Sequence, residues 1–130
     1  MFQYILAAAL ILHGLANLGG VAAPFTSSGN GFSNQHWVFS SGVVLHSMAG
    51  KTYGLVWLLS TILLVASGLG LIRGQPWWLT AAIAGSATSF LAIAPWWGAV
   101  PPGARFGAIF DVLMLVLLLS PLGTRIAESI

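Results

Sequence analysis

Long apolar stretches alternate with short stretches of polar residues, glycine and proline along the chain. Four of the apolar stretches approach the roughly 20 residues that a helix needs to cross the hydrocarbon core of a bilayer. They predict helices over residues 2–21, 52–72, 76–96 and 105–122. A membrane β-barrel would instead show short segments of alternating hydrophobicity. The pattern therefore predicts an all-α fold, a single domain formed by a bundle of four transmembrane helices.

The region between the first two predicted helices, residues 24–50, is less regular. Residues 24–35 are rich in Ser, Gly and Asn and carry no charge, which is typical of a loop outside the hydrocarbon. Residues 36–46 are more apolar but too short and interrupted to span a bilayer. An interfacial helix, a re-entrant piece and an extension of the second helix all fit, and we favour an interfacial or extended helix.

Tryptophan pairs bracket the third predicted helix, at Trp77-Trp78 and at Trp96-Trp97. A helical rise of 1.5 Å per residue separates the pairs by roughly 27–30 Å, which is the spacing of two interfacial aromatic belts. Pro76 is expected to begin this helix, because a proline in the first turn lacks only an N–H that would have no helical partner.

Composition supports a membrane protein, since 58% of the 130 residues are hydrophobic, 5% are charged, and the mean hydropathy is +0.95. Soluble domains carry about 25% charged residues. The formal charge of +2 comes from six scattered residues, which excludes a nucleic-acid-binding surface. The absence of cysteine excludes disulfides and thiolate metal sites.

The distribution of charge bears on which side of the bilayer holds the termini. Four spans place both termini and the Arg73 turn on one side of the bilayer, and the connections that carry Lys51 and Arg105 on the other. Each side then has two basic residues, so the positive-inside rule gives a tie. The α-amino group and the longer uncharged first loop favour both termini inside.

Small residues recur at four-residue spacing in the third predicted helix, at Ala81, Gly85 and Ser89. Helices in lipid associate through close packing and interhelical hydrogen bonds, which favours small residues at their contacts. These three positions share one helix face, so we expect them to pack against a neighbouring helix.

Asp111 stands out because its neighbours in the fourth predicted helix are apolar, and a carboxylate in hydrocarbon costs several kcal/mol unless it is neutralised or paired. Arg105 is a poor partner, since six positions along a helix separate the two side chains by about 120°. His13 is the better partner. It lies about two-thirds of the way along the first helix, and Asp111 lies about 9 Å inside the opposite-running fourth helix. Asn17 follows His13 by one turn on the same face.

Two interpretations of this polar layer remain open. His13, Asn17 and Asp111 form either a cluster that accepts protons or orients a ligand, or an interhelical clamp that only fixes helix register. His36, His46, Lys51 and Arg105 are secondary candidates that also suit interfacial positions. The three histidines lack the spacing of metal or haem ligands, so we predict no metal site and do not expect haem.

Residues 12–18, LHGLANL, resemble the first helix of the DoxX-like family of small four-helix bacterial membrane proteins, and residues 110–114, FDVLM, resemble its fourth. Asn17 stands where that family often has a basic residue. The resemblance implies the cytoplasmic membrane of a bacterium and an association with quinone-linked or thiol-related redox complexes, often as a membrane subunit. Without cysteine, any thiol chemistry here would come from a partner.

Three functions are compatible with the sequence. The first, which we favour, is an accessory subunit and not an enzyme, and it binds a hydrophobic ligand such as a quinone, a membrane protein partner or a second copy. The second is a proton-coupled small transporter or channel that uses Asp111. The third is a membrane enzyme in which His13 and Asp111 form an acid–base pair.

Overall fold

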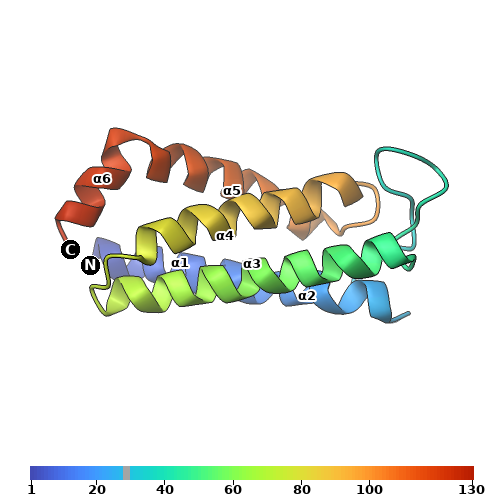
Figure 1. Ribbon diagram of the computed structural model, residues 1–130, viewed down its shortest axis with the longest axis horizontal. Helices are drawn as coiled ribbons and strands as arrows, with labels where there is room; N and C mark the ends of the chain where they lie inside the picture. The colour runs from blue at the N-terminus through green and yellow to red at the C-terminus, as the bar shows by residue number, and fades with distance from the viewer. Residues whose placement is uncertain (28–29) are drawn as a thin grey trace.

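The computed structural model describes residues 1–27 and 30–130. This part of the chain folds into helices and loops, with one isolated β-bridge and no strand. Four helical segments are long and apolar enough to cross a membrane, namely Phe2–Phe25, Met48–Ile72, Trp78–Trp96 and Pro102–Leu119. They run alongside one another as a bundle (Figure 1). The prediction of an all-α fold with four helices of spanning length is confirmed.

The first segment is not one regular helix. It contains α1 (Phe2–Ala16), α2 (Leu18–Ala22) and the 3₁₀ turn η1 (Ala23–Phe25), with a break at Asn17. The remaining elements are α3 (Met48–Ile72), α4 (Trp78–Ile93), the 3₁₀ turn η2 (Ala94–Trp96), α5 (Pro102–Leu119) and α6 (Pro121–Glu128).

The boundaries of the second and third predicted helices shift for identifiable reasons. The second begins at Met48 and not at residue 52, because the Ser47 side chain caps it by accepting a hydrogen bond from the Gly50 N–H. At its other end, Gly74 has a positive φ of 63°, and the Gln75 N–H bonds back to the Gly70 carbonyl. This Schellman turn leaves Pro76 outside the next helix, which begins at Trp78.

The fourth predicted helix, residues 105–122, begins earlier and ends earlier than expected. The helix α5 starts at Pro102, where a proline needs no N–H partner, and stops at Leu119. Ser120 is extended because the following Pro121 disfavours helical geometry in the residue before it. The Ser120 hydroxyl then accepts a hydrogen bond from the Leu122 N–H and caps α6, a helix that the sequence did not predict.

The expectation of a helix within residues 36–46 is wrong. His36 and Val44 form an antiparallel bridge, and the Trp37 N–H donates to the Val43 carbonyl at 3.0 Å. The Val38 N–H bonds instead to the Pro95 carbonyl at 2.8 Å, which ties the loop to η2. The backbone groups of this segment are thus paired across the loop and with the bundle. Residues 28–29 of the predicted polar loop lie outside the described residues.

Neighbouring helices pack in chain order, α1 against α3, α3 against α4, and α4 against α5. The helices α1 and α5 make no extensive backbone contact within the described chain. Both termini and the α3–α4 turn lie at one end of the bundle, and the loop before α3 lies at the other (Figure 1). Below, these are the terminal end and the loop end.

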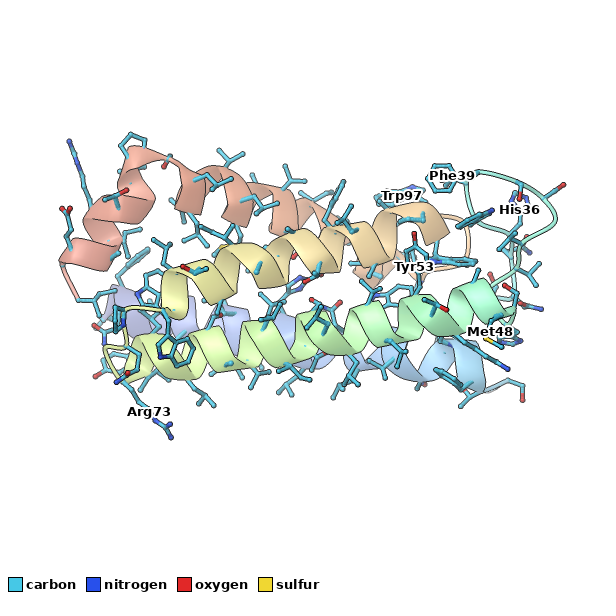
Figure 2. All side chains as sticks on the ribbon, viewed as in Figure 1. His36, Phe39, Met48, Tyr53, Arg73 and Trp97 are labelled. Atoms are coloured by element: carbon cyan, nitrogen blue, oxygen red, sulfur yellow. The ribbon has the colours of Figure 1, made fainter. Side chains whose placement is uncertain are left out.

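Aromatic side chains join the loop to the bundle at the loop end. Trp96 is fully buried, and its ring centroid lies 5.9 Å from that of Trp37 and 5.7 Å from that of Tyr53. Figure 2 places Tyr53, Phe39 and Trp97 at this end and Arg73 at the other. In each tryptophan pair one ring faces inward, since Trp78 and Trp96 are buried whereas their neighbours Trp77 and Trp97 are exposed.

The outer surface of the bundle is apolar. Many large hydrophobic side chains are exposed along α1, α3 and α5, among them Leu12, Leu59, Phe106 and Val116. Soluble monomers rarely expose contiguous apolar surface of this extent. Such a surface suits hydrocarbon as its solvent.

Candidate functional site

The buried centre of the bundle contains a histidine–aspartate pair. His13 Nε2 of α1 lies 2.7 Å from Asp111 Oδ1 of α5. The Asp111 side chain is fully buried, and the His13 side chain is 11% exposed. Because α1 and α5 make little backbone contact, they are linked through side chains, of which this pair is the charged or polar one. The ring of Phe110 lies beside the imidazole, with centroids 4.7 Å apart.

Asn17 extends the pair into a network that reaches all four long helical segments. Its Nδ2 donates to Ser60 Oγ of α3 and to Ser89 Oγ of α4, each at 3.1 Å. Ser60 Oγ in turn donates to the Gly85 carbonyl at 3.1 Å. Ser89 Oγ lies 3.2 Å from His13 Nε2, so the serine joins the amide to the histidine. Asn17 itself is buried and occupies the break between α1 and α2.

The structure brings together the three residues of the predicted polar layer, His13, Asn17 and Asp111. Arg105 is not among them. Its Nε and Nη2 donate to the Trp97 carbonyl at 3.1 and 2.9 Å, and its guanidinium lies over the Trp97 ring. Arg105 therefore holds the connection between α4 and α5.

The small-residue row of α4 lies partly at the α3 contact and partly in the network. Gly85 is buried, and a Cβ there would come within 2.9 Å of Leu64 Cγ on α3. Ala81 is half-buried. Ser89, which the sequence suggested only as a packing residue, is the hydroxyl that links Asn17 to His13.

Ser60 belongs to the network but was not predicted from the sequence to be part of it. The available signal was the polar pair Ser60-Thr61 near the middle of a predicted helix. That signal is weak, because serines are frequent in membrane helices and often bond to their own backbone. Ser67 does so here, donating to the Leu64 carbonyl at 2.8 Å.

His36, His46 and Lys51 lie at the loop end and take no part in the network. His36 is exposed, and its Nδ1 donates to the Trp37 carbonyl at 2.8 Å. His46 and Lys51 line a separate surface pocket with residues 24–27. Among the described residues, no group of three His, Cys, Asp or Glu side chains is placed to hold a metal ion.

A cavity of about 280 Å³ borders the network on the side of the loop end. It lies between α1 and α2 on one side and the start of α5 on the other. His13 and Asn17 line its inner part. The α5 wall consists of small residues, Gly103, Ala104 and Gly107. A Cβ at Gly107 would lie 3.1 Å from His13 Cε1, so this glycine keeps space open beside the imidazole.

Two polar atoms of the histidine–aspartate pair have no hydrogen-bond partner among the described residues. Asp111 Oδ2 is one, and it is buried. His13 Nδ1 is the other, since the hydrogen bonds of the ring are made through Nε2. In the described chain the buried unpaired side-chain atoms are Ser86 Oγ, Trp96 Nε1 and Asp111 Oδ2, so Nδ1 reaches accessible surface. His13 thus offers the cavity an unused ring nitrogen.

Comparison of the chain with models of protein families, with curated proteins and with solved structures gave no match. The resemblance to the DoxX-like family stays a prediction, and any function has to be argued from the geometry of the network and the cavity.

Proposed function

We propose that the chain is an integral membrane protein whose four long helical segments cross the bilayer, with both termini on the cytoplasmic side of a bacterial membrane. The length and apolar composition of these segments support this proposal, as does the exposure of large hydrophobic side chains along them. Arg73 follows the last residue of α3 and Arg105 lies in the first turn of α5, so both charges are near helix ends where they can reach the lipid headgroups.

We propose further that the cavity binds the polar head of a hydrophobic ligand. The observation that carries this proposal is the position of the cavity, which borders the network of His13, Asn17 and Asp111 in an otherwise apolar bundle. Ligand pockets combine apolar walls with a few convergent polar groups in this way.

The size of the cavity limits the ligand. Its volume is about 280 Å³, nearly twice the roughly 150 Å³ of an engineered cavity that holds benzene. A single substituted ring therefore fits, and a benzoquinone head is of this size. Leu12 and Leu15 of α1 and Phe106 of α5 are exposed and adjoin cavity residues in the sequence, so they provide surface for an apolar tail.

The layer next to the network favours binding over conduction. One turn towards the terminal end, α1, α3 and α5 each contribute a buried apolar side chain to the same core cluster, Leu10, Leu64 and Met114, whereas α4 contributes the buried Ser86. A proton path through the bundle would have to cross this layer, where the described residues supply the Ser86 hydroxyl but no ionisable side chain. We therefore place the protein as a binding subunit that acts beside a membrane partner or a second copy, and not as a channel.

Filling the cavity from α5 tests the binding proposal. A valine at Gly107 would press on the His13 ring, because a Cβ there already lies 3.1 Å from Cε1. We expect Gly107→Val to weaken binding of a decyl-benzoquinone by at least about tenfold. The measurement is tryptophan quenching in lipid nanodiscs, since Trp57 lines the cavity.

The matched control for this variant is Gly98→Val, because no atom lies within 4 Å of a Cβ built at Gly98. Gly98 is also outside the cavity lining. We expect it to bind the quinone as the unsubstituted protein does. Equal quenching by the quinone in both variants would mean that the probe only partitions into lipid or binds elsewhere on the bundle.

A further inference from the structure

We propose that the cavity selects ligands whose head group accepts a hydrogen bond, such as a carbonyl or an oxyanion, because His13 presents Nδ1 to the cavity as a donor. This inference rests on the proposed binding function and adds the chemical class of the ligand to it.

Contacts of the imidazole fix which nitrogen is available. Nε2 lies 2.7 Å from Asp111 Oδ1 and 3.2 Å from Ser89 Oγ. Nδ1, on the other side of Cε1, has no partner among the described residues and belongs to a ring that lines the cavity. A head group in the cavity therefore meets Nδ1 and not Nε2.

The number of protons on the pair decides whether Nδ1 donates. Two arrangements of His13 and Asp111 have no net charge and leave no carboxyl O–H without an acceptor, since Oδ2 is buried and has no partner among the described residues. In the first, an imidazolium faces a carboxylate, and both ring nitrogens carry hydrogen. In the second, a carboxylic acid donates to Nε2 of a neutral imidazole, so the ring hydrogen is on Nδ1. Both neutral arrangements place a hydrogen on Nδ1.

An acceptor at Nδ1 would require either an Asp111 proton on Oδ2 or a net negative charge on the pair. In the first case a buried O–H would have no acceptor among the described residues. In the second case the imidazole would donate from Nε2 to a carboxylate that no cation balances. Uncompensated charge in a low-dielectric interior is costly. The nearest cation along α5, Arg105, is engaged by the Trp97 carbonyl, and His13 is the one titratable residue that lines the cavity in the described chain.

Asn17 does not supply a second donor at the same place. Its amide carries two hydrogens, and these are directed to Ser60 Oγ and Ser89 Oγ. Its carbonyl Oδ1 is an acceptor and lies 3.5 Å from the Ser89 hydroxyl, which donates to it. The donor that the network offers the cavity is therefore His13 Nδ1.

Three probes with the same tail test this selectivity in nanodiscs. Decyl-benzoquinone offers acceptors, decylindole offers a donor N–H without a comparable acceptor, and decylbenzene offers neither. We expect the quinone to bind about three- to tenfold more tightly than the other two, which is the usual effect of one hydrogen bond. In His13→Leu this preference is expected to disappear.

Each pattern of affinities has a distinct meaning. Equal binding of all three probes would overturn the donor assignment while leaving a binding cavity in place. Binding of none would overturn the proposed function as well.

A second measurement does not depend on ligand binding or on a substitution of His13. The chain has three histidines, so ring ¹⁵N labelling gives three sets of signals, which His36→Gln and His46→Gln assign. We expect His13 Nδ1 to carry a proton at neutral pH in lipid bilayers. An unprotonated Nδ1 would overturn the inference.

Discussion

Replacing His13 with leucine is expected to destabilise the protein by about 3 kcal/mol, and replacing Asp111 with leucine by about 1 kcal/mol. The two losses of stability differ because of what each substitution leaves behind. In His13→Leu, the fully buried Asp111 carboxyl loses the imidazole at Oδ1, and its Oδ2 already has no partner among the described residues. His13 is 11% exposed, borders the cavity and keeps the Ser89 hydroxyl near Nε2 when the carboxyl is removed.

The double variant His13→Leu/Asp111→Leu is expected to be more stable than His13→Leu by about 1 kcal/mol, since it leaves no polar group without its partner. Reversible unfolding of the four proteins of this cycle in mixed lipid–detergent micelles measures the coupling. If the losses of stability in the two single variants add up to the loss in the double variant, the short His13–Asp111 contact does not stabilise the bundle. If the pair stabilises the bundle but its substitution leaves the affinity for the quinone unchanged, the pair acts only as a helix clamp.

The second large effect on stability is expected at Trp96, and the adjacent residue Trp97 provides the matched control. Trp96→Ala is expected to cost about 3–5 kcal/mol, because truncation of a buried tryptophan removes a large contact area and leaves a void. Trp96 is fully buried, and its ring packs against the rings of Trp37 in the loop and Tyr53 in α3.

Trp97→Ala is expected to cost about 1 kcal/mol or less, since the Trp97 side chain is 40% exposed and its ring contributes a cation–π contact with Arg105. The bond that Arg105 makes to the Trp97 backbone carbonyl survives this substitution. The free energy of unfolding, measured as for the cycle, compares the two variants. Similar losses at both positions would contradict the inward and outward orientations of the two rings.

Much of the fold is predictable from the sequence because the bilayer imposes a length and an apolar composition on any helix that crosses it. The predicted helix over residues 76–96 and the segment Trp78–Trp96 differ only at the start. The structure of the loop before α3 is harder to predict, because residues 36–46 have the composition of an interfacial helix. Their structure depends on backbone bonds to distant partners, such as Val38 to Pro95.

The polar layer could be predicted in part because depth in an antiparallel bundle follows from position along each helix. Depth along the helices pairs His13 with Asp111, which lie 98 positions apart in the chain. It could not find the cavity, which depends on a gap between α1 and α5 and on the absence of a side chain at Gly107. Nor could it separate Ser60 from serines such as Ser67 that bond to their own helix.

The most direct test of a ligand-binding cavity beside the His13–Asp111 pair is an experimental structure of the protein in a lipid nanodisc with decyl-benzoquinone. We expect the quinone ring between α1 and α5, with one carbonyl oxygen about 3 Å from His13 Nδ1. The competing location is an apolar groove of about 210 Å³ beside Phe90, Trp97 and Ile109, which has no polar lining group. Quinone density in that groove, together with an unliganded cavity at saturating quinone, would contradict the proposed function.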